Sequence, residues 1–300
     1  MKKIKFKKKF KKPIYLALGM FDCVHTAHAH IIDEVCKRSN ERNCLSAVFT
    51  FSDIVSKLYK KNDKSVYTFS ERLERFYEKN VDLVIFARAT NRFLKMAPEK
   101  FLNILSNHYN ILGIVCGQDY TFGKGASGNI TVLQDFSLQK CIDLKIVDTF
   151  KEDGEKISTS LIKELILKGD IEKANNLLGS SYFVKSKVVK GSGIGKSFLF
   201  PTANIMPDRK KLKLKDGVYL TKTKINNKIY SSLTNCGPRP SVDNETGFIE
   251  THVLDFDGNL YKKEITVYFY KRLRDTKKFE NLEDLKKQIR EDIQFAGNKN

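Results

Sequence analysis

The spacing of apolar segments along the 300 residues changes at about residue 180, and this change constrains the fold more than any other feature. Before it, short apolar runs alternate with longer amphipathic ones, as expected for strands buried on both faces of a sheet and the helices between them. Ser70 suits the N-cap of one such helix and Pro98 the first turn of another. The alternation predicts an α/β domain with an open parallel sheet, in which ligands lie at the carboxyl ends of the strands. We expect strands at 14–18, 45–51, 83–86, 114–116 and 144–147, and helices at 28–38, 70–79 and 98–109.

After the change, β-branched and aromatic runs follow one another with little room for helices. Such closely spaced strands predict a small antiparallel barrel. A short helix, capped by Asp170 and ended by Gly179, joins the two patterns. We therefore expect two domains, 1–179 and 180–300. The expected barrel strands are 182–189, 217–224, 228–234, 248–256 and 264–270, with turns at 226–227 and 257–258 and a closing helix at 282–295.

The net charge of +19, from 54 basic and 35 acidic residues, raises the hypothesis of a nucleic-acid partner. Apart from the first twelve residues, however, the lysines are spread through the whole chain, and no recognised nucleic-acid-binding motif accompanies them. Genome bias accounts for a lysine-rich composition equally well, and the first twelve residues fit a solvated tail or an edge strand. A positive field also favours polyanionic small substrates such as ATP. We do not expect nucleic acid to be a partner.

Membrane insertion and secretion are not expected. No apolar run approaches the ~20 residues that cross a bilayer, and segment 14–21 lacks a small-residue cleavage site after it. Six scattered cysteines without a C-x-x-C pair indicate reduced thiols rather than a disulfide or zinc framework. The composition favours a cytoplasmic protein and leaves its oligomeric state open.

A glycine-rich segment at 191–204 has the features of a phosphate and metal site. Its glycines let backbone N–H groups approach an anion, and a lysine adds positive charge. In an extended segment, the hydroxyl of Thr202 and the amide oxygen of Asn204 point the same way and suit Mg²⁺. A glycine-rich surface hairpin is the alternative. The candidates are Gly191, Gly193, Gly195 and Lys196 for phosphate, Pro201 for the turn, and Thr202 and Asn204 for the metal.

The order Gly-x-Gly-x-Gly-Lys-x-x-x-Phe-Pro-Thr-Ala-Asn resembles the signature of flavokinases. This resemblance implies that Thr202 and Asn204 hold the Mg²⁺ of Mg·ATP. It also implies that Glu250 is the general base that takes the proton from the ribityl 5′-hydroxyl as it attacks the γ-phosphate. Strand alternation does not say which way Glu250 points. Asn235 and Arg274 match the family pattern too, with Arg274 expected near the flavin or, alternatively, in a surface ion pair.

In the first domain, the first predicted strand runs into a segment with two histidines and then into a helix. His25 and His28 therefore lie near a helix N-terminus, where backbone N–H groups and the helix dipole favour phosphate. Imidazole N–H groups there would stabilise charge on a pentavalent phosphorus. A capping or core histidine is one alternative, and a zinc site that includes His30 is another. We do not expect zinc, because His30 would point away from the face shared by the other two.

Gly-x-Phe-Asp-x-x-His-x-x-His resembles the nucleotidylyltransferase motif, in particular the FAD-synthetase branch with Gly-x-Phe-Asp-Gly-Val-His-x-Gly-His. Cys23 and Ala27 stand where that branch has glycine, and Ala27 adds a Cβ where the nucleotide approaches closely. The resemblance implies catalytic roles for His25 and His28 and nucleotide binding by Gly19, Phe21 and Asp22.

Two further segments resemble the same branch. Loop 117–129 would line the flavin and adenylate sites, with Asp119 near the ribose or the flavin. Segment 156–163 would bind the departing pyrophosphate, although capping alone explains its hydroxyls. Leu161 replaces an arginine of the family pattern, and the Pro-His-Pro that usually follows the second strand is missing after Phe51. The implicated residues are Gly117, Asp119, Phe122, Gly123, Gly128, Ser158, Thr159, Ser160 and Lys163.

Together the resemblances cover about residues 14–296 and imply a bifunctional riboflavin kinase/FMN adenylyltransferase of the bacterial FAD-synthetase type. A nucleotidylyltransferase-like, Rossmann-like domain would precede a riboflavin kinase barrel, with riboflavin, FMN, FAD and ATP as ligands and Mg²⁺ as cofactor. Three alternatives stay open. The first domain could be a degenerate partner of an active kinase, or it could adenylylate another phosphate-bearing substrate. The third alternative is a basic RNA-binding or regulatory protein on the same fold.

Overall fold

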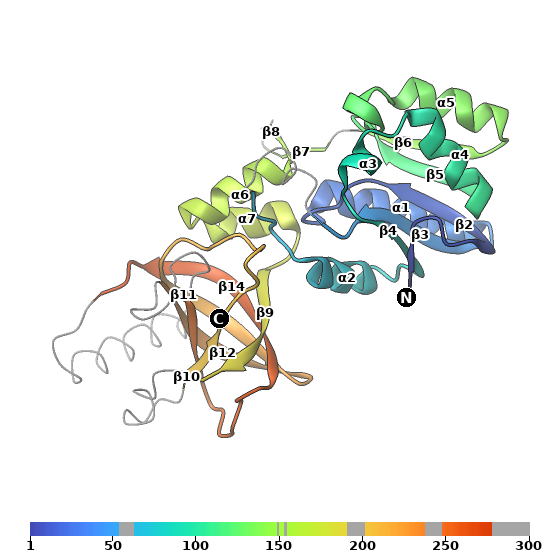
Figure 1. The fold of residues 1–300 in the computed structure, drawn as a ribbon. Helices are drawn as coiled ribbons and strands as arrows, with labels where there is room; N and C mark the ends of the chain where they lie inside the picture. The colour runs from blue at the N-terminus through green and yellow to red at the C-terminus, as the bar shows by residue number, and fades with distance from the viewer. Residues whose placement is uncertain (54–62, 149, 153–154, 191–201, 238–247, 278–300) are drawn as a thin grey trace. The chain divides into compact units, whose positions relative to one another are not determined.

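The computed structural model describes two compact units, 1–159 and 160–300 (Figure 1). Helices α6 (Thr159–Lys168) and α7 (Ile171–Leu178) group with the second unit, apart from the first residue of α6. The sequence pattern placed the domain boundary after these helices, at 179, and that boundary stays a prediction about where the two functions divide. The description covers all residues except 54–62, 149, 153–154, 191–201, 238–247 and 278–300.

The first unit is built on a parallel six-stranded sheet with the order β1-β4-β3-β2-β5-β6. Each predicted strand is present, several of them longer than expected, and β1 is added at one edge. The strands are β1 (Lys2–Lys5), β2 (Phe10–Leu18), β3 (Leu45–Phe51), β4 (Leu83–Ala87), β5 (Tyr109–Gly117) and β6 (Asp143–Val147). The helices are α1 (Thr26–Glu41), α2 (Phe69–Glu78), α3 (Asn91–Leu94), α4 (Pro98–His108) and α5 (Ile130–Gln139).

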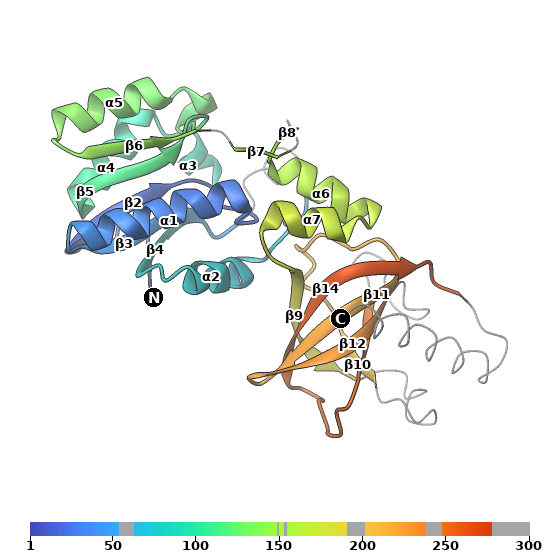
Figure 2. The ribbon, with the colours of Figure 1, turned by 180° about the vertical axis from the view of Figure 1, so that it is seen from behind.

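Both faces of this sheet are covered by helices, which explains the near-continuous apolarity of its strands. Alternate residues of β2 enter different cores: Leu16 packs on the face of α4 and α5, whereas Ala17 packs on the face of α1 and α2. Figure 2 shows α1 lying against its face of the sheet. The expected α/β class with a parallel sheet is confirmed. A two-stranded antiparallel ribbon, β7 (Lys151–Glu152) and β8 (Glu155–Lys156), follows the sheet.

The edge strand β1 accounts for the lysine-rich start of the chain. It pairs in parallel with β4, from Lys2 opposite Leu83 to Lys5 opposite Phe86. Ile4 is buried in the core while the lysines of the strand are exposed. The edge-strand interpretation is therefore correct for residues 2–5, whereas residues 10–12 begin the inner strand β2.

The helix starts follow the expected capping chemistry with one correction. Pro98 occupies the first turn of α4, as predicted. The N-cap of α2 is Thr68 rather than Ser70. Thr68 accepts a hydrogen bond from the backbone N–H of Glu71 at 3.3 Å, and the Glu71 carboxylate accepts one from the Thr68 N–H at 2.8 Å. This reciprocal pair requires a Glu three residues after the cap, and that spacing selects Thr68.

The second unit contains a closed, all-antiparallel barrel with the order β10-β13-β12-β11-β14-β9, as the spacing of its strands predicted. Segment 202–205 is indeed extended, since it forms β10. The strand at 248 ends at Val253, because Asp255 turns the chain with φ 53°. The predicted closing helix at 282–295 lies outside the described residues. The barrel strands are β9 (Tyr182–Val189), β10 (Thr202–Ile205), β11 (Gly217–Ile225), β12 (Lys228–Gly237), β13 (Phe248–Val253) and β14 (Glu264–Arg274).

Buried hydroxyl groups connect three strands inside this barrel. Thr221 on β11 contacts Ser232 and Thr234 on β12 at 2.8 and 2.7 Å. Thr234 in turn contacts Thr251 on β13 at 2.8 Å. Each hydroxyl both donates and accepts, so a connected set satisfies groups whose burial would otherwise be unfavourable.

Helix α7 is docked on the barrel through Asn175. Its side-chain amide donates to the carbonyl of Phe269 at 2.8 Å and accepts from the N–H of Tyr182 at 2.7 Å. The predicted capping is confirmed: Asp170 is the N-cap, and Gly179 ends the helix with a left-handed φ of 64°. Two side-chain hydrogen bonds thus fix this helix to β14 and β9.

Candidate active sites

A hollow of about 300 Å³ lies at the carboxyl ends of β2, β5 and β6 in the first unit. Parallel sheets place ligands at this edge. We call it the histidine hollow. It brings together residues from the three predicted segments that lie far apart in the chain. Of the predicted site residues, Gly19, Phe21, His25, His28, Gly117, Asp119, Ser158 and Thr159 line it.

His25 and His28 form a stacked pair at the start of α1. Their ring centroids are 3.7 Å apart and their planes are inclined by 10°. His25 is the N-cap residue, and its Nδ1 accepts the backbone N–H of His28 at 3.2 Å. Because Nδ1 supplies a lone pair to this bond, a neutral His25 carries its proton on Nε2. The first turn of α1 contains no acidic residue, so its N-terminus is suited to an anion.

Burial keeps both imidazoles neutral. It lowers the pKa of His25 to about 4, although the nearby Asp119 acts in the opposite direction. The pKa of His28 also lies well below its ordinary value, first because of burial and then because of the charge that His25 would carry. Each ring at neutral pH therefore offers one N–H donor rather than two.

The other residues predicted for the adenylyltransferase site differ in their position relative to the hollow. Asp119 is held at its rim by Lys156, whose Nζ lies 2.5 Å from the carboxylate. Asp22 is buried next to the hollow rather than lining it. Ser160 and Lys163 lie on α6 in the second unit, as does Leu161 in the place of the family arginine.

A second hollow of about 290 Å³ adjoins the first and shares Gly19, Met20, Tyr120 and Thr121 with it. We call it the aromatic chamber. It contains two of the predicted loop residues, Phe122 and Gly123. Gly128 supports this loop, because a Cβ there would lie 2.7 Å from the Phe122 ring. The sequence analysis missed the chamber's other walls: Phe49, Phe51, Phe93, Leu94, Met96 and Phe101. They come from β3, α3, α4 and the segment between the two helices, so no local pattern joins them.

Arg72 on α2 is a further residue that the sequence analysis missed. Its side chain is only 4% exposed and donates to the carbonyls of Met20 and Phe51 at 3.2 and 2.7 Å, and to the Thr50 hydroxyl at 3.1 Å. Met20 lines both hollows. Arg72 therefore ties the segment after β2 to the end of β3, where the family's Pro-His-Pro is missing.

Ala27 and Cys23, which stand where the FAD-synthetase branch has glycine, have different surroundings. Ala27 lines the hollow. Cys23 is fully buried, and its Sγ lies 3.4 Å from the hydroxyl of Thr159. Its thiol and the two imidazoles each place one ligand atom within 4.8 Å of the others. His30, which the zinc alternative invoked, instead stacks on Phe150 at 4.0 Å.

In the second unit, strand register places four predicted residues in one row across the barrel. Glu250 on β13 is opposite both Asn204 on β10 and Asn235 on β12. Asn235 and Arg274 are both opposite Val218 of β11. Residues directly opposite on neighbouring strands share a face of the sheet, so these four residues lie in one row although they are up to 70 positions apart in the sequence.

Glu250 points away from the barrel interior, which settles a question that strand alternation left open. Ile249 and Thr251, on either side of it, are buried inside. The Thr202 hydroxyl donates a hydrogen bond to Glu250 Oε1 at 2.7 Å, and Asn204 is 8% exposed. A hydroxyl, an amide and a carboxylate therefore meet on β10 and β13. Gly191, Gly193, Gly195, Lys196 and Pro201 lie outside the described residues.

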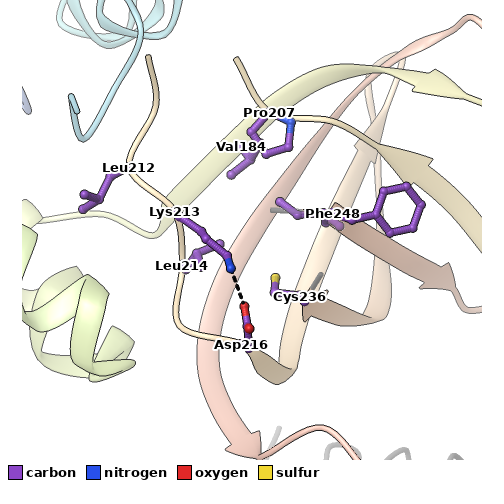
Figure 3. Close-up of a pocket in the computed structure, with 10 residues that line it drawn as sticks. Val184, Pro207, Leu212, Lys213, Leu214, Asp216, Cys236 and Phe248 are labelled. Atoms are coloured by element: carbon purple, nitrogen blue, oxygen red, sulfur yellow. Dashed lines mark ion pairs between the residues drawn. The ribbon is translucent and has the colours of Figure 1, made fainter. Parts of the chain in front are cut away.

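A small cavity between β9, β12 and segment 212–216 is too small for a substrate (Figure 3). Its volume of about 10 Å³ leaves room for about one water molecule. Lys213 and Asp216 form an ion pair at its edge, with 3.2 Å between Nζ and Oδ1. Figure 3 also shows Cys236 among its lining residues, and burial raises the pKa of that thiol.

Two family models match different parts of the chain. A family model for riboflavin kinase matches residues 178–299, and one for FAD synthetase matches residues 7–161. The bifunctional riboflavin kinase/FMN adenylyltransferase of Haemophilus influenzae is 30% identical over 285 residues, covering 94% of this chain and 92% of that protein. This chain belongs to the bifunctional riboflavin kinase/FMN adenylyltransferase family. The protein of the same description from Bacillus subtilis is 30% identical over 287 residues, covering 94% and 90%.

The fold of this riboflavin kinase/FMN adenylyltransferase family member also matches a solved structure. That crystal structure is described as a macrolide-efflux protein from Streptococcus pneumoniae. It superposes with a TM-score of 0.89 over 99% of each chain. At 24% identity the likeness concerns the fold alone. Among the described helices, none combines the length and apolarity that a membrane crossing requires.

Proposed function

We propose that the second unit transfers the γ-phosphate of ATP to riboflavin and that the first unit joins the resulting FMN to AMP from a second ATP. The hydrogen bond between Thr202 and Glu250, in a row with Asn204 and Asn235, carries the kinase assignment. The stacked histidine pair at the start of α1 carries the adenylyltransferase assignment. The family membership of the chain supports both.

In the kinase reaction, Glu250 acts as the general base. Its Oε1 is held by Thr202, which leaves the other carboxylate oxygen to take the proton of the ribityl hydroxyl. The hydroxyl oxygen then forms a bond to the γ-phosphorus, the bond from that phosphorus to the β-phosphate oxygen breaks, and ADP leaves. The protein's contribution to such a transfer is mainly positioning and electrostatics.

Thr202 and Asn204 provide the oxygens that fit a divalent metal. A hydroxyl and an amide two positions apart on one strand are hard donors of the kind that Mg²⁺ accepts. The Thr202 hydroxyl donates a hydrogen bond to Glu250, so its lone pairs are available to a cation. Mg²⁺ would neutralise charge on the ATP phosphates.

In the adenylyl transfer, a phosphate oxygen of FMN attacks the α-phosphorus of ATP. The bond from that phosphorus to the β-phosphate oxygen breaks, and pyrophosphate leaves. His25 directs its Nε2–H and α1 its N-terminal N–H groups toward the charge that develops. Ser158 and Thr159, on the wall of the same hollow, would bind the pyrophosphate.

The aromatic chamber would hold the flavin ring of FMN during this step. Its walls are mainly aromatic and aliphatic side chains, including Phe51, Phe93 and Met96. A flat aromatic ring system packs favourably against such surfaces. The chamber adjoins the histidine hollow, so a phosphate attached to that ring can reach the ATP site.

Product analysis with two substrate mixtures tests the proposal. FMN with Mg·ATP and no riboflavin should yield FAD and pyrophosphate, whereas riboflavin with Mg·ATP should yield FMN and then FAD. Absence of FAD from the first mixture, with FMN formed in the second, would establish the alternative of an active kinase with a degenerate first domain.

A matched pair of histidine variants locates the adenylyl transfer. His28→Gln should reduce FAD formation about 10²-fold or more, the effect expected for removing a transition-state donor. His108→Gln is the control, because His108 contacts the carbonyl of Ile104 at the far end of α4. Equal activity of the two variants would contradict the assignment of the histidine hollow.

The cellular setting follows from the chemistry. ATP as substrate and six cysteines that are all thiols favour the cytoplasm. RNA is not an expected partner, because the basic residues are spread through the chain without a recognised nucleic-acid-binding motif. Salt-sensitive retention of RNA by the active protein would overturn that expectation.

A further inference from the structure

Cys23, His25 and His28 form a cluster, and the proposed reactions use its imidazoles but give no role to its thiol. The three ligand atoms, one from each side chain, lie within 4.8 Å of one another. Val24, between the first two residues, has a left-handed φ of 47°, and His25 caps α1. This turn and the first turn of the helix bring positions 23, 25 and 28 to one point.

The donor atoms select a particular kind of metal. One sulfur and two imidazole nitrogens suit zinc, whereas Mg²⁺ prefers oxygen. Three protein ligands are enough to hold zinc. Zinc bonds of ~2.0–2.3 Å place tetrahedral ligand atoms roughly 3.3–3.8 Å apart. Side-chain rotations that draw these atoms together by about 1–1.5 Å would therefore complete the site.

His28 gives independent support for a ligand at this point. Its Nδ1 is buried and has no hydrogen-bond partner in the described part of the chain. A buried polar atom without a partner is unfavourable, and native structures contain few of them. A metal bond would satisfy this nitrogen. The Thr159 hydroxyl, 3.4 Å from Cys23, lies beside the cluster and lines the histidine hollow.

We propose that Cys23, His25 and His28 bind one Zn²⁺ and that this zinc excludes ATP from the histidine hollow. This inference rests on the proposed adenylyltransferase function of that hollow. The exclusion has a chemical reason. Phosphate needs the N–H of His25 Nε2, whereas zinc bound at this atom needs its lone pair. Zinc therefore shifts the proton to Nδ1 and replaces the cap bond with a metal bond.

Cobalt absorption tests the site without relying on activity. Chelator-treated full-length protein should bind one Co²⁺ and show the thiolate-to-cobalt charge-transfer band in the near ultraviolet, and Zn²⁺ should abolish the band. Cys23→Ser should lose the band and weaken Zn²⁺ binding at least ~100-fold, because a direct ligand matters no less than the groups that support ligands. Cys141→Ser is the control, since Cys141 is exposed and outside the cluster. A missing band in the wild type, or a band that persists in Cys23→Ser, overturns the site.

Kinetics test the exclusion of ATP. With FMN as substrate, zinc at its binding concentration should raise the KM for ATP at least ~10-fold and leave kcat unchanged, whereas Cys23→Ser should respond far less. Zinc that binds without changing KM overturns the exclusion. If the wild type forms no FAD, the adenylyltransferase proposal fails. The cobalt band then still shows whether the three residues bind a metal. Displacement of a bound fluorescent ATP analogue by Zn²⁺ shows whether the metal excludes ATP.

Discussion

The two imidazoles at the start of α1 differ in their hydrogen-bond partners. His25 Nδ1 accepts the hydrogen bond that caps the helix, so its Nε2–H remains available to a substrate. His28 stacks on it and has a buried Nδ1 without a partner among the described residues. Their arrangement follows from local sequence: a strand, a short turn and a helix start place residues three apart on one face.

The lowered pKa of His25 predicts how stability depends on pH. Above pH 6.5 the folded and unfolded forms both hold a neutral imidazole, and the shift has no effect. Between pH 6.5 and about 4 only the unfolded form gains the proton, so the free energy of unfolding falls as the pH decreases. At pH 5 the loss is about 2 kcal/mol. Denaturant titrations in chelating buffer at pH 7 and pH 5 measure it, and His25→Asn should show a smaller loss. An equal loss in this variant would show that protonation of His25 is not the cause of the pH dependence.

Glu250→Gln should reduce FMN formation about 10²–10⁴-fold, because the amide cannot take the hydroxyl proton. The Gln side chain can still accept the hydrogen bond from Thr202, so the barrel should remain folded. Formation of FAD from FMN should continue. Glu264→Gln is the matched control, since Glu264 forms an exposed ion pair with Lys185 on the same barrel. If Glu250→Gln phosphorylates riboflavin at the wild-type rate, Glu250 is not the general base.

At the scale of secondary structure, the motifs were predictable where a single segment carries them. The helix from Asp170 to Gly179 and the extended segment at Thr202 follow from caps, turns and Pro201. The aromatic chamber could not be predicted, because Phe49, Phe93 and Phe122 meet only in the folded sheet. The Cys23 cluster was missed for a similar reason: it depends on the left-handed turn at Val24, and β-branched residues rarely adopt that conformation.

Helix α2 contributes to the first site through Arg72. Arg72→Lys should lower the free energy of unfolding of the first unit by about 2–3 kcal/mol, because lysine cannot reproduce a forked set of charged hydrogen bonds. Adenylyl transfer should weaken as Met20 loses its anchor, while FMN formation should not change. Thermal denaturation with parallel assays of both activities measures this. Arg92→Lys on exposed α3 is the control. Equal stability of the two variants would show that Arg72 is not an anchor.

At the scale of the molecule, the two units contain separate chemistry. The parallel sheet and the antiparallel barrel were both predictable, because the spacing of apolar runs differs between them. Helix α7 packs with the barrel through contacts such as that of Asn175 with Phe269, and the predicted boundary at 179 between the two functions stays a prediction. The net charge raised the RNA hypothesis, and three of the lysines that contribute to it lie on the edge strand β1.

Separate sites predict complementation between variants. Glu250→Gln alone should make no FAD from riboflavin, and His28→Gln alone should stop at FMN. A mixture of the two proteins should form FAD after a lag in which FMN accumulates, because the kinase of one supplies the adenylyltransferase of the other. Chromatography of the flavins over time follows the reaction. A mixture that accumulates FMN but no FAD would indicate that FMN released by one chain does not reach the other.

The lysines of β1 have a consequence for how this protein behaves at high concentration. A sheet border with unpaired N–H and C=O groups invites a neighbouring molecule to add a strand, and charged side chains there discourage it. Deleting residues 2–5 would bare Leu-Val-Ile-Phe-Ala of β4 as the new border. We expect such a truncated protein to scatter light and precipitate where the intact chain remains dispersed. The basic start of the chain would then serve as a guard against self-association.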